Sequence, residues 1–541
     1  MDHNAQNGIL IMNGIRYDKR LMLAFGSVLL AIFSVGAYGQ AGVSSDIAPL
    51  TIQNSQALAS EIEPALQRFV DRQERLPTQA AQIRVMVTAD PVTGVVWIDL
   101  DAGYLPKDAP VFSEDLGAKL RDVENEAYEL IAGLVRFRYI KIRIAGRHIN
   151  EIYPPEHSTK KTTGTPPAVI ASVPGSVVLN PGHGRYLHHA DETWRHQRPT
   201  PYAGTTDVYE DTVTPGYSST LARLLTQRSS DIITTIYHTR DIGNAEIDPE
   251  SGFAWAEVGA RYHLQRLYPS LGEKIWNKFP NGSPSRKPPS RGYLREYDED
   301  IRARPEYANY INAGTLISLH TDASDNPSAR GTTIISNIDD PRSYQLGSNI
   351  HCYVTEQIQQ LPDYATYLIR PGVRDGANYG EVREAAMPTT LVEIGFHSNV
   401  DDSKALQSSV FRAAAMRGVE KGYRTFKKGE TECSPFKIAS IPPVSGKFRV
   451  RLPVPVRLQG HPRFPVTVVN VPIICPPDWT CRNKTSSFRT AVDNVITPTF
   501  YCDAPNTKPP ATFTLRSTVR DADGIVTSAV DHTVSCSAGV Q

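Results

Sequence analysis

Between residues 176 and 428 the sequence alternates short apolar runs with longer segments of helical spacing. Alternating strands and helices are typical of α/β folds, in which helices cover a sheet of largely parallel strands. The sequence therefore predicts an α/β domain here, with a mixed or parallel sheet flanked by helices. The expected strands include 177–179, 232–237, 314–319, 332–336 and 390–394, and the expected helices include 218–228, 254–267, 343–361 and 404–426.

The flanking regions have different patterns. Residues 55–152 contain two helical segments and three strand-like runs, which predicts a small accessory α+β domain. Residues 153–175 are rich in Pro, Thr, Ser and Lys without periodicity and are expected to form a linker. In residues 429–541 short strand-like runs are interrupted by proline, so a β-rich domain is expected there. The stretch 277–300 is expected to be an inserted loop.

Five of the six cysteines lie in the β-rich C-terminal region, and only Cys352 lies earlier. Disulfides are common in exported proteins, so this clustering favours an oxidising compartment. The spacing allows a small loop between Cys475 and Cys481 and a larger one between Cys502 and Cys536, with one tail cysteine left over. Because connectivity does not follow from sequence alone, the pairing stays open. The sequence contains no CxxC pair, so a zinc ribbon is not indicated.

The N-terminus resembles a secretory signal peptide. Lys19 and Arg20 precede an apolar run over residues 21–35, and small residues follow before Gln40. We expect residues 1–39 to be a signal peptide and the protein to be exported to the periplasm or cell envelope. A retained membrane anchor is the alternative, although the apolar run is short for spanning a bilayer. The formal net charge of zero gives no general bias toward nucleic acid.

Three expected strands of the α/β region carry a histidine or glutamate at or near their ends. His183 follows the first strand, His320 ends "LISLH", and Glu393 lies in "LVEIGF". The carboxyl ends of parallel strands meet at one edge of a sheet, where reactive groups of α/β proteins gather. Imidazole and carboxylate ligands are what a catalytic Zn²⁺ uses. Gly182 and Gly184 flank His183 and leave room for a sharp turn.

The segments "NPGHG", "SLHTDAS" and "LVEIGFHSN", in this order, resemble the zinc-dependent N-acetylmuramoyl-L-alanine amidases. "YHTRD" and Arg261 are similar to the family as well, and the resemblance covers about residues 176–428. It implies one zinc ion held by His183, a glutamate ahead of the first helix, and His320. It also implies that Glu393 is the catalytic glutamate.

The middle ligand is less clear, because the loop after His183 is longer than is usual in the family. We favour Glu210, which precedes the helix expected at 218–228, and Glu192 is the alternative. The first motif also begins with Asn180, where the family commonly has aspartate, and this removes a charge near the metal. An asparagine still orients the loop through hydrogen bonds.

The resemblance implies hydrolysis of the amide between N-acetylmuramic acid and L-alanine of peptidoglycan stem peptides. Peptidoglycan is then the partner, no nucleic acid is expected, and an envelope protein that activates the enzyme remains unidentified. Two alternatives stay open: a zinc carboxypeptidase acting on cell-wall peptides, and a non-catalytic wall-binding protein. The HExxH signature of common metalloproteases is absent.

Overall fold

A computed structural model of the chain describes residues 49–107, 111–156, 175–198, 208–278, 293–324 and 326–538. The expected signal peptide and most of the expected linker lie outside these ranges. Within them, no helix is long and apolar enough to span a bilayer.

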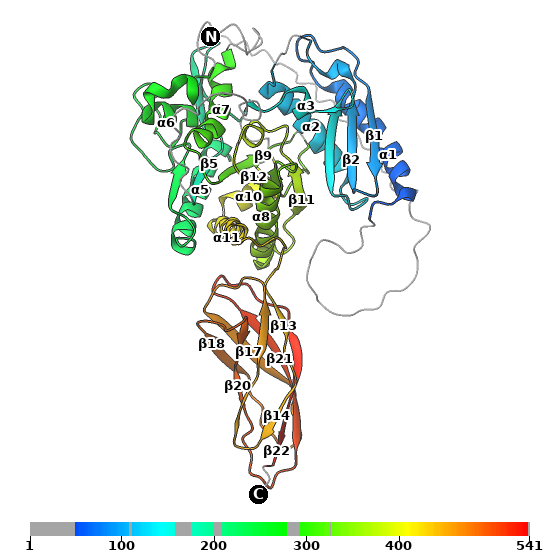
Figure 1. Cartoon of the computed structure of the whole chain (residues 1–541), viewed down its shortest axis with the longest axis vertical. Coiled ribbons are helices and arrows are strands. Elements are labelled where there is room, and N and C mark those ends of the chain that lie inside the picture. Colours follow the sequence, from blue (N-terminus) through cyan, green and yellow to red (C-terminus); the bar gives the residue numbers. More distant parts are fainter. Residues whose placement is uncertain are drawn as a thin grey trace, which may run out of the picture. The chain divides into compact units, whose positions relative to one another are not determined.

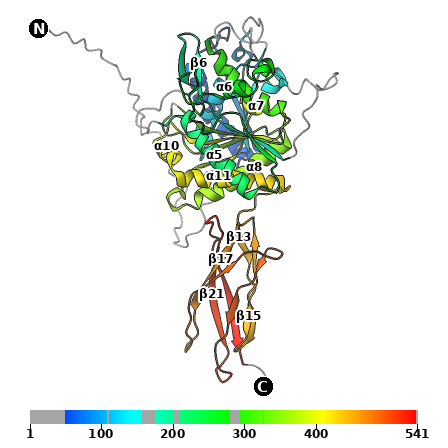
Figure 2. The ribbon, with the colours of Figure 1, turned by 90° about the vertical axis from the view of Figure 1, so that its left-hand side faces the viewer.

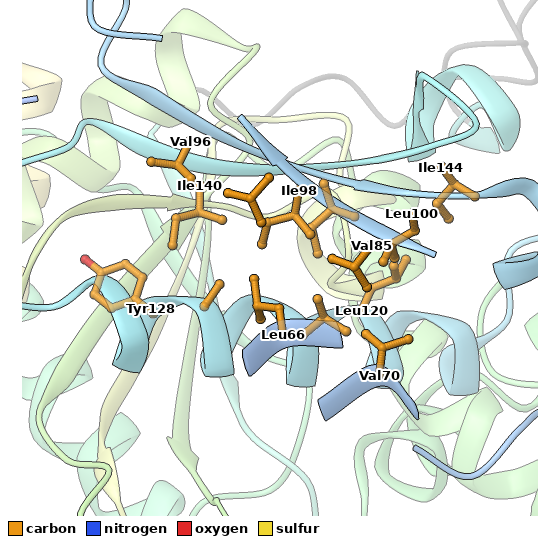
Figure 3. Packing of buried hydrophobic residues seen from close by; sticks show 14 of the residues in the cluster. Leu66, Val70, Val85, Val96, Ile98, Leu100, Leu120, Tyr128, Ile140 and Ile144 are labelled. Carbon is orange, nitrogen blue, oxygen red and sulfur yellow. The ribbon is translucent and has the colours of Figure 1, made fainter. Parts of the chain in front are cut away.

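The N-terminal region is a small α+β unit with its own core (Figure 1). Two amphipathic helices cover one face of a four-stranded sheet of order β1-β2-β3-β4. Figure 3 shows Leu66 and Leu120 of the helices packed beneath Ile98 of the sheet. The elements are α1 (Ile52–Arg72), β1 (Val85–Asp90), β2 (Val95–Leu100), η2 (Ala102–Tyr104), α2 (Glu114–Ile131), β3 (Tyr139–Ile144), β4 (Arg147–His148) and α3 (Ile149–Ile152).

The central region is built on a six-stranded sheet of order β11-β10-β12-β9-β5-β8. β5 is parallel to β8 and β9, β9 is parallel to β12, and β10 runs antiparallel to β12. The sheet is therefore mixed with a parallel centre, as the sequence predicts. The strands are β5 (Ser176–Pro181), β8 (Thr235–His238), β9 (Leu316–Asp322), β10 (Thr332–Ser336), β11 (Ile369–Asp375) and β12 (Thr389–Phe396).

Helices cover both faces of this sheet because its central strands are apolar on both sides. Val177 and Leu179 of β5 pack with α5, α8 and α11, which lie near one another in Figure 2. Val178 faces the other side and packs with α6 and α7. The helices are α5 (Glu210–Arg228), α6 (Ala260–Leu267), η3 (Pro269–Lys274), α7 (Arg295–Tyr310), α8 (Pro341–Gln359), η5 (Pro362–Tyr364), α9 (Gly380–Arg383), α10 (Val400–Gln407) and α11 (Ser409–Lys427).

The C-terminal region consists of strands around a third apolar core (Figure 1). Its largest sheet has the order β14-β22-β21-β17-β18. A three-stranded sheet, β13-β16-β19, and the pair β15-β20 complete it. The strands are β13 (Lys437–Ser440), β14 (Val444–Lys447), β15 (Arg451–Pro453), β16 (Val456–Gln459), β17 (Val466–Ile474), β18 (Lys484–Phe488), β19 (Val495–Ile496), β20 (Thr499–Tyr501), β21 (Ala511–Arg520) and β22 (Val530–Ser537).

All six cysteines are paired. The bridges Cys475–Cys481 and Cys502–Cys536 close the two loops that the spacing allows. The tail cysteine left over in the sequence, Cys433, bonds to Cys352 of α8 across a separation of 81 residues. This bridge ties the segment after α11 back to the central region.

Several expected boundaries were wrong. The helix expected from Ser218 begins earlier, at Glu210. Pro215 and Gly216 lie inside it, and because both are poor helix formers the sequence pattern places the start too late. Part of the expected loop after His183 is a hairpin of β6 (Arg185–His188) and β7 (Thr193–His196). The inserted loop expected over 277–300 overlaps the start of α7. Neither β11 nor the short α9 was predicted.

Candidate metal centre

His183 lies just beyond the end of β5, in a backbone conformation that ordinary residues avoid. Its φ is +57°, in the left-handed region, and its side chain is buried. Such strain persists only where the surrounding structure enforces it, and it is common at functional sites. The turn therefore directs the imidazole inward.

The glycines on either side of His183 are required by close contacts. A Cβ on Gly182 would lie 2.5 Å from Nδ1 of His320. A Cβ on Gly184, whose φ is +143°, would lie 2.5 Å from Cα of Gly259. Any side chain at either position would collide with a neighbour, which explains why this histidine is enclosed by glycines.

His320 and Glu393 are brought together by strand register. They are direct partners on the neighbouring parallel strands β9 and β12. Both side chains are buried and line one cavity. The imidazole rings of His183 and His320 meet edge to face, with centroids 4.9 Å apart. Three of the residues chosen from sequence thus converge at one edge of the sheet.

Glu210, the first residue of α5, completes the cluster. Its Oε1 lies 2.9 Å from Nδ1 of His320 and accepts a hydrogen bond from the backbone of Thr321. Its Oε2 is buried, lies 3.7 Å from Nε2 of His183, and has no hydrogen-bond partner among the described residues. One ligand atom from each of His183, Glu210 and His320 lies within 4.8 Å of the others. This donor set fits Zn²⁺, which prefers imidazole nitrogen and carboxylate oxygen.

In each histidine, the ring nitrogen that does not face Glu210 contacts another buried group. Nδ1 of His183 donates to Oε1 of Gln197 at 2.7 Å, which leaves Nε2 free to face the cluster. Nε2 of His320 lies 3.1 Å from the carboxylate of Glu381. The buried guanidinium of Arg304 donates to both Gln197 and Glu381. Partners of this kind orient metal-binding histidines in proteins.

Burial and neighbouring charges perturb the pKa of each central group. Burial holds the pKa of His183 well below its ordinary value, so its imidazole is neutral. Burial also opposes the charged form of His320, but Glu381 and Glu210 outweigh it and raise that pKa to about 10. For Glu393, burial and then Asp322 raise the pKa well above its usual range. Sites that move protons characteristically contain such groups.

Arg240 fixes the backbone around the cluster. This fully buried guanidinium donates to the carbonyl oxygens of Gly182 and His183, and also to those of Asp211 and Ala256. It therefore ties the His183 turn to the start of α5, where Glu210 lies. Arg240 belongs to the "YHTRD" segment, which is similar to the amidase family but whose role did not follow from the sequence.

A cavity of about 190 Å³ opens onto the cluster and onto Glu393. Arg198 also lines it, with Nε 3.8 Å from Oε2 of Glu210. The guanidinium of Arg198 donates to the hydroxyl of Tyr297. The cavity thus combines the cluster, a buried carboxyl group and a cation.

The alternative ligand Glu192 lies apart from this cluster, exposed in the turn between β6 and β7. Asn180 orients the first motif as expected: its Nδ2 donates to Ser318 and Glu381, and its Oδ1 accepts from Thr239. Gln197, Arg304, Glu381 and Arg198 were missed, because none of them belongs to a recognisable motif.

Residues 287–424 match the family model of the N-acetylmuramoyl-L-alanine amidases. This region is therefore similar to the amidase family. The match spans about a quarter of the chain and includes His320 and Glu393, while His183 and Glu210 precede it. Comparison with curated proteins gives no match.

Three solved structures that share some similarity with the chain are described as amidases. The CwlD amidase from Clostridioides difficile, in complex with the GerS lipoprotein, is 15% identical, with 47% of this chain and 100% of that chain covered and a TM-score of 0.30. The catalytic domain of CwlV from Bacillus (Paenibacillus) polymyxa var. colistinus is 18% identical, with 46% and 94% covered and a TM-score of 0.28. Ami1 from Mycobacterium smegmatis is 15% identical, with 48% and 100% covered and a TM-score of 0.29.

Proposed function

We propose that the chain is a zinc-dependent amidase that hydrolyses the bond between N-acetylmuramic acid and L-alanine of peptidoglycan stem peptides. The single observation that carries this proposal is the buried His183, Glu210 and His320 cluster beside Glu393. The family match of the region that contains His320 and Glu393 supports the choice of substrate.

The three clustered residues would hold the zinc ion. A buried carboxylate oxygen of Glu210 without a hydrogen-bond partner is the kind of atom that a cation satisfies. Zinc, when bound, supplies polarisation of a carbonyl oxygen and a lowered pKa for water. Gln197 and Glu381 keep the two imidazoles oriented, and Arg304 links these two residues.

Glu393 is the proposed proton carrier. Its carboxyl lines the same cavity as the cluster, and its Oε2 is buried without a hydrogen-bond partner among the described residues. A carboxyl whose pKa is raised holds a proton more firmly, which suits a group that accepts a proton from water and returns it to a leaving amine.

Arg198 is the proposed stabiliser of negative charge. Its guanidinium remains protonated, because burial disfavours its charge but Tyr297 and Glu210 outweigh burial and raise its pKa. A fixed cation beside the cluster would favour the charge that develops on the scissile carbonyl oxygen. The same position would also suit a carboxylate of the stem peptide.

We also propose the wider setting. An exported protein in the periplasm or cell envelope fits the three disulfides and a wall substrate. The proposed domains are a signal peptide (1–39), an accessory domain (55–152), a linker (153–175), the catalytic domain (176–428) and a β-rich domain (429–541).

The test is digestion of purified peptidoglycan by the full zinc-loaded chain, with products identified by mass spectrometry. We expect intact stem peptides with a new L-alanine amino terminus, and uncut glycan strands. Release of single D-alanine residues would instead indicate a carboxypeptidase. Binding of the zinc-loaded wild-type chain to peptidoglycan without any release would indicate a wall-binding protein.

A further inference from the structure

The β-rich C-terminal region contains a cavity of its own, which lies among β17, β18, β20, β21 and β22 (Figure 1). It measures about 470 Å³, whereas the cavity at the metal centre measures about 190 Å³. Pockets that hold small organic ligands generally measure about 300–1,000 Å³. The residues that line this cavity all lie within 454–532, so it is a separate site from the metal centre.

Aromatic rings make up much of the cavity lining. Trp479, Phe500 and Phe513 line it. Trp479 and Phe500 each pack against Phe513, with ring centroids 5.0 and 5.3 Å apart. Tyr501 lines the cavity as well, and 46% of its surface is exposed. Large aromatic side chains that stay partly exposed are typical of surfaces that bind another molecule. The cavity therefore offers flat apolar faces to a ligand.

Trp479 is held in a fixed position by its surroundings. It lies in the loop that the Cys475–Cys481 disulfide closes. Its backbone N–H donates to the carbonyl oxygen of Pro476 at 3.2 Å, and Nζ of Lys508 lies 4.7 Å from the centroid of its indole ring. A side chain that is already ordered loses little conformational entropy when a ligand packs against it. The indole ring is therefore prepared for a contact with a ligand.

His532 gives the cavity a buried hydrogen-bond acceptor. It lines the cavity and is only 6% exposed. The hydroxyl of Ser517 donates to Oδ1 of Asn470, so the oxygen of Ser517 accepts from Nε2 of His532 at 2.9 Å. Burial lowers the pKa of His532 against a smaller opposing effect of Asp531, so the imidazole is neutral and carries one N–H. Nδ1 is then an acceptor, and it has no hydrogen-bond partner among the described residues.

The charges around the cavity nearly cancel. Charged residues of both signs line it: Arg482, Lys484, Lys508, Asp478 and Asp503. A nearly neutral set of this kind does not favour a polyanion such as a nucleic acid. A wholly apolar ligand is not favoured either, because it would leave the acceptor of the buried histidine without a hydrogen bond. The lining therefore suits a ligand that is both polar and close to neutral.

The strands that line the cavity do not favour an added peptide strand. β17, β21 and β22 contribute to the lining, and each has a neighbour on both sides in the sheet of order β14-β22-β21-β17-β18. A peptide that extends a sheet needs an unpaired strand edge. Recognition in this cavity therefore depends on side chains.

We propose that this cavity binds a saccharide. A sugar ring has carbon–hydrogen groups on its faces, which suit the rings of Trp479 and Tyr501. It has hydroxyl groups around its edge, and one of these would donate to Nδ1 of His532. The wall glycan and other polysaccharides of the envelope share this chemistry. Binding here requires neither zinc nor hydrolysis, so the inference goes beyond the proposed amidase function.

The test is binding to the full chain, measured by isothermal titration calorimetry. The probes are wall glycan strands stripped of stem peptides, envelope polysaccharide freed of peptidoglycan, and purified stem peptides. We expect at least one of the two saccharides to bind, which identifies the source, and EDTA to leave its affinity unchanged. Stripped glycan lacks the bond between muramic acid and alanine, so failure of the proposed hydrolysis would not affect this result.

Two variants and a control locate the binding. Trp479→Ala should lower the affinity for the saccharide at least about tenfold, as for central aromatic residues of binding sites. This change also removes packing against Phe513, so the exposed Arg482→Ala is a second variant and should lower the affinity about threefold. Arg489→Ala is the matched control, since Arg489 is exposed in the same region but does not line the cavity. It should bind as the wild type does.

Three results would overturn the proposal. Binding of stem peptides but of neither saccharide would make the cavity a peptide site. A folded wild-type chain that binds no probe at millimolar concentration would exclude a saccharide. Saccharide binding that EDTA abolishes, or that folded Trp479→Ala and Arg482→Ala both retain at the wild-type affinity, would place the saccharide elsewhere on the chain.

Discussion

Gly182 leaves the space that the imidazole of His320 occupies, since a Cβ at this position would lie 2.5 Å from Nδ1 of His320. We therefore expect Gly182→Ala to displace a proposed ligand while leaving every ligand residue in the sequence. Zinc affinity, measured by equilibrium dialysis, should fall at least about tenfold, the lower range for disturbing groups that orient a ligand.

Gly243 provides the control for this substitution. A Cβ there would meet no atom within 4 Å, and its φ is not in the left-handed region. Gly243→Ala should bind zinc as the wild type does. Equal affinity of the Gly182→Ala and Gly243→Ala variants would contradict the close contact with His320.

The ligand set makes a second prediction. His183→Ala, Glu210→Ala and His320→Ala should each lose most bound zinc, because a site with three protein ligands tolerates the loss of none. Glu192→Ala should retain zinc, since Glu192 is exposed in the hairpin turn. Metal content after gel filtration measures this. Zinc retained by Glu210→Ala but lost from Glu192→Ala would reverse the choice of the middle ligand.

The third prediction separates binding of the metal from stabilisation of charge. Arg198→Ala should keep its zinc yet lower kcat about a hundredfold, the effect typical of losing one donor to a developing oxyanion. Arg195→Ala is the matched control, because Arg195 is exposed on β7 and pairs with Asp191. An unchanged kcat for Arg198→Ala would remove Arg198 from the mechanism.

The sequence predicted the central fold because its strands are apolar and short and its helices are periodic. His183, His320 and Glu393 could be chosen because each interrupts or ends such a strand, where an unpaired polar group is costly. Glu210 was chosen by its place ahead of a helix, although the helix begins at Glu210 itself. Pro215 lies inside this helix, and because proline usually ends a helix the sequence pattern did not show the true start.

The supporting groups could not be predicted, because they come together only in the folded chain. Gln197 and Glu381 are separated by nearly two hundred residues, yet Arg304 bonds to both. The bridge from Cys352 to Cys433 joins different regions in the same way. Arg121 and Asn125 of α2 line the cavity only because the N-terminal unit packs against the central region, and no local pattern in α2 encodes that contact.

A fourth prediction concerns pH and Glu124 of α2. Burial raises the pKa of Glu124 to about 8. The positive charges of Arg374 and Arg121 oppose this rise only in part, whereas the negative charges of Asp375 and Asp322 add to it. The ordinary value is 4.5, so below that pH both folded and unfolded chains carry the proton. Between pH 4.5 and about 8 only the unfolded chain releases it, and the folded chain therefore loses stability as pH rises.

Glu124→Gln cannot titrate and should lack this contribution. The fall in the thermal unfolding midpoint between pH 5 and pH 8.5, measured by calorimetry, should be smaller in Glu124→Gln than in the wild type. Glu126→Gln, on the same helix and only half-buried, is the comparison. Identical pH dependence in Glu124→Gln and the wild type would show that Glu124 is not held protonated in the folded chain.

The fifth prediction distinguishes holding a metal from using it. Glu393 lies in the apolar part of β12, and its carboxyl reaches the cavity without a hydrogen-bond partner for Oε2 among the described residues. Glu393→Gln keeps the shape of the side chain but cannot exchange a proton. Zinc content and the unfolding midpoint should stay near wild-type values, while release of stem peptides should fall at least about a hundredfold, the lower end for general acid-base catalysis. Turnover close to the wild-type rate in zinc-loaded Glu393→Gln would exclude this residue as the proton carrier.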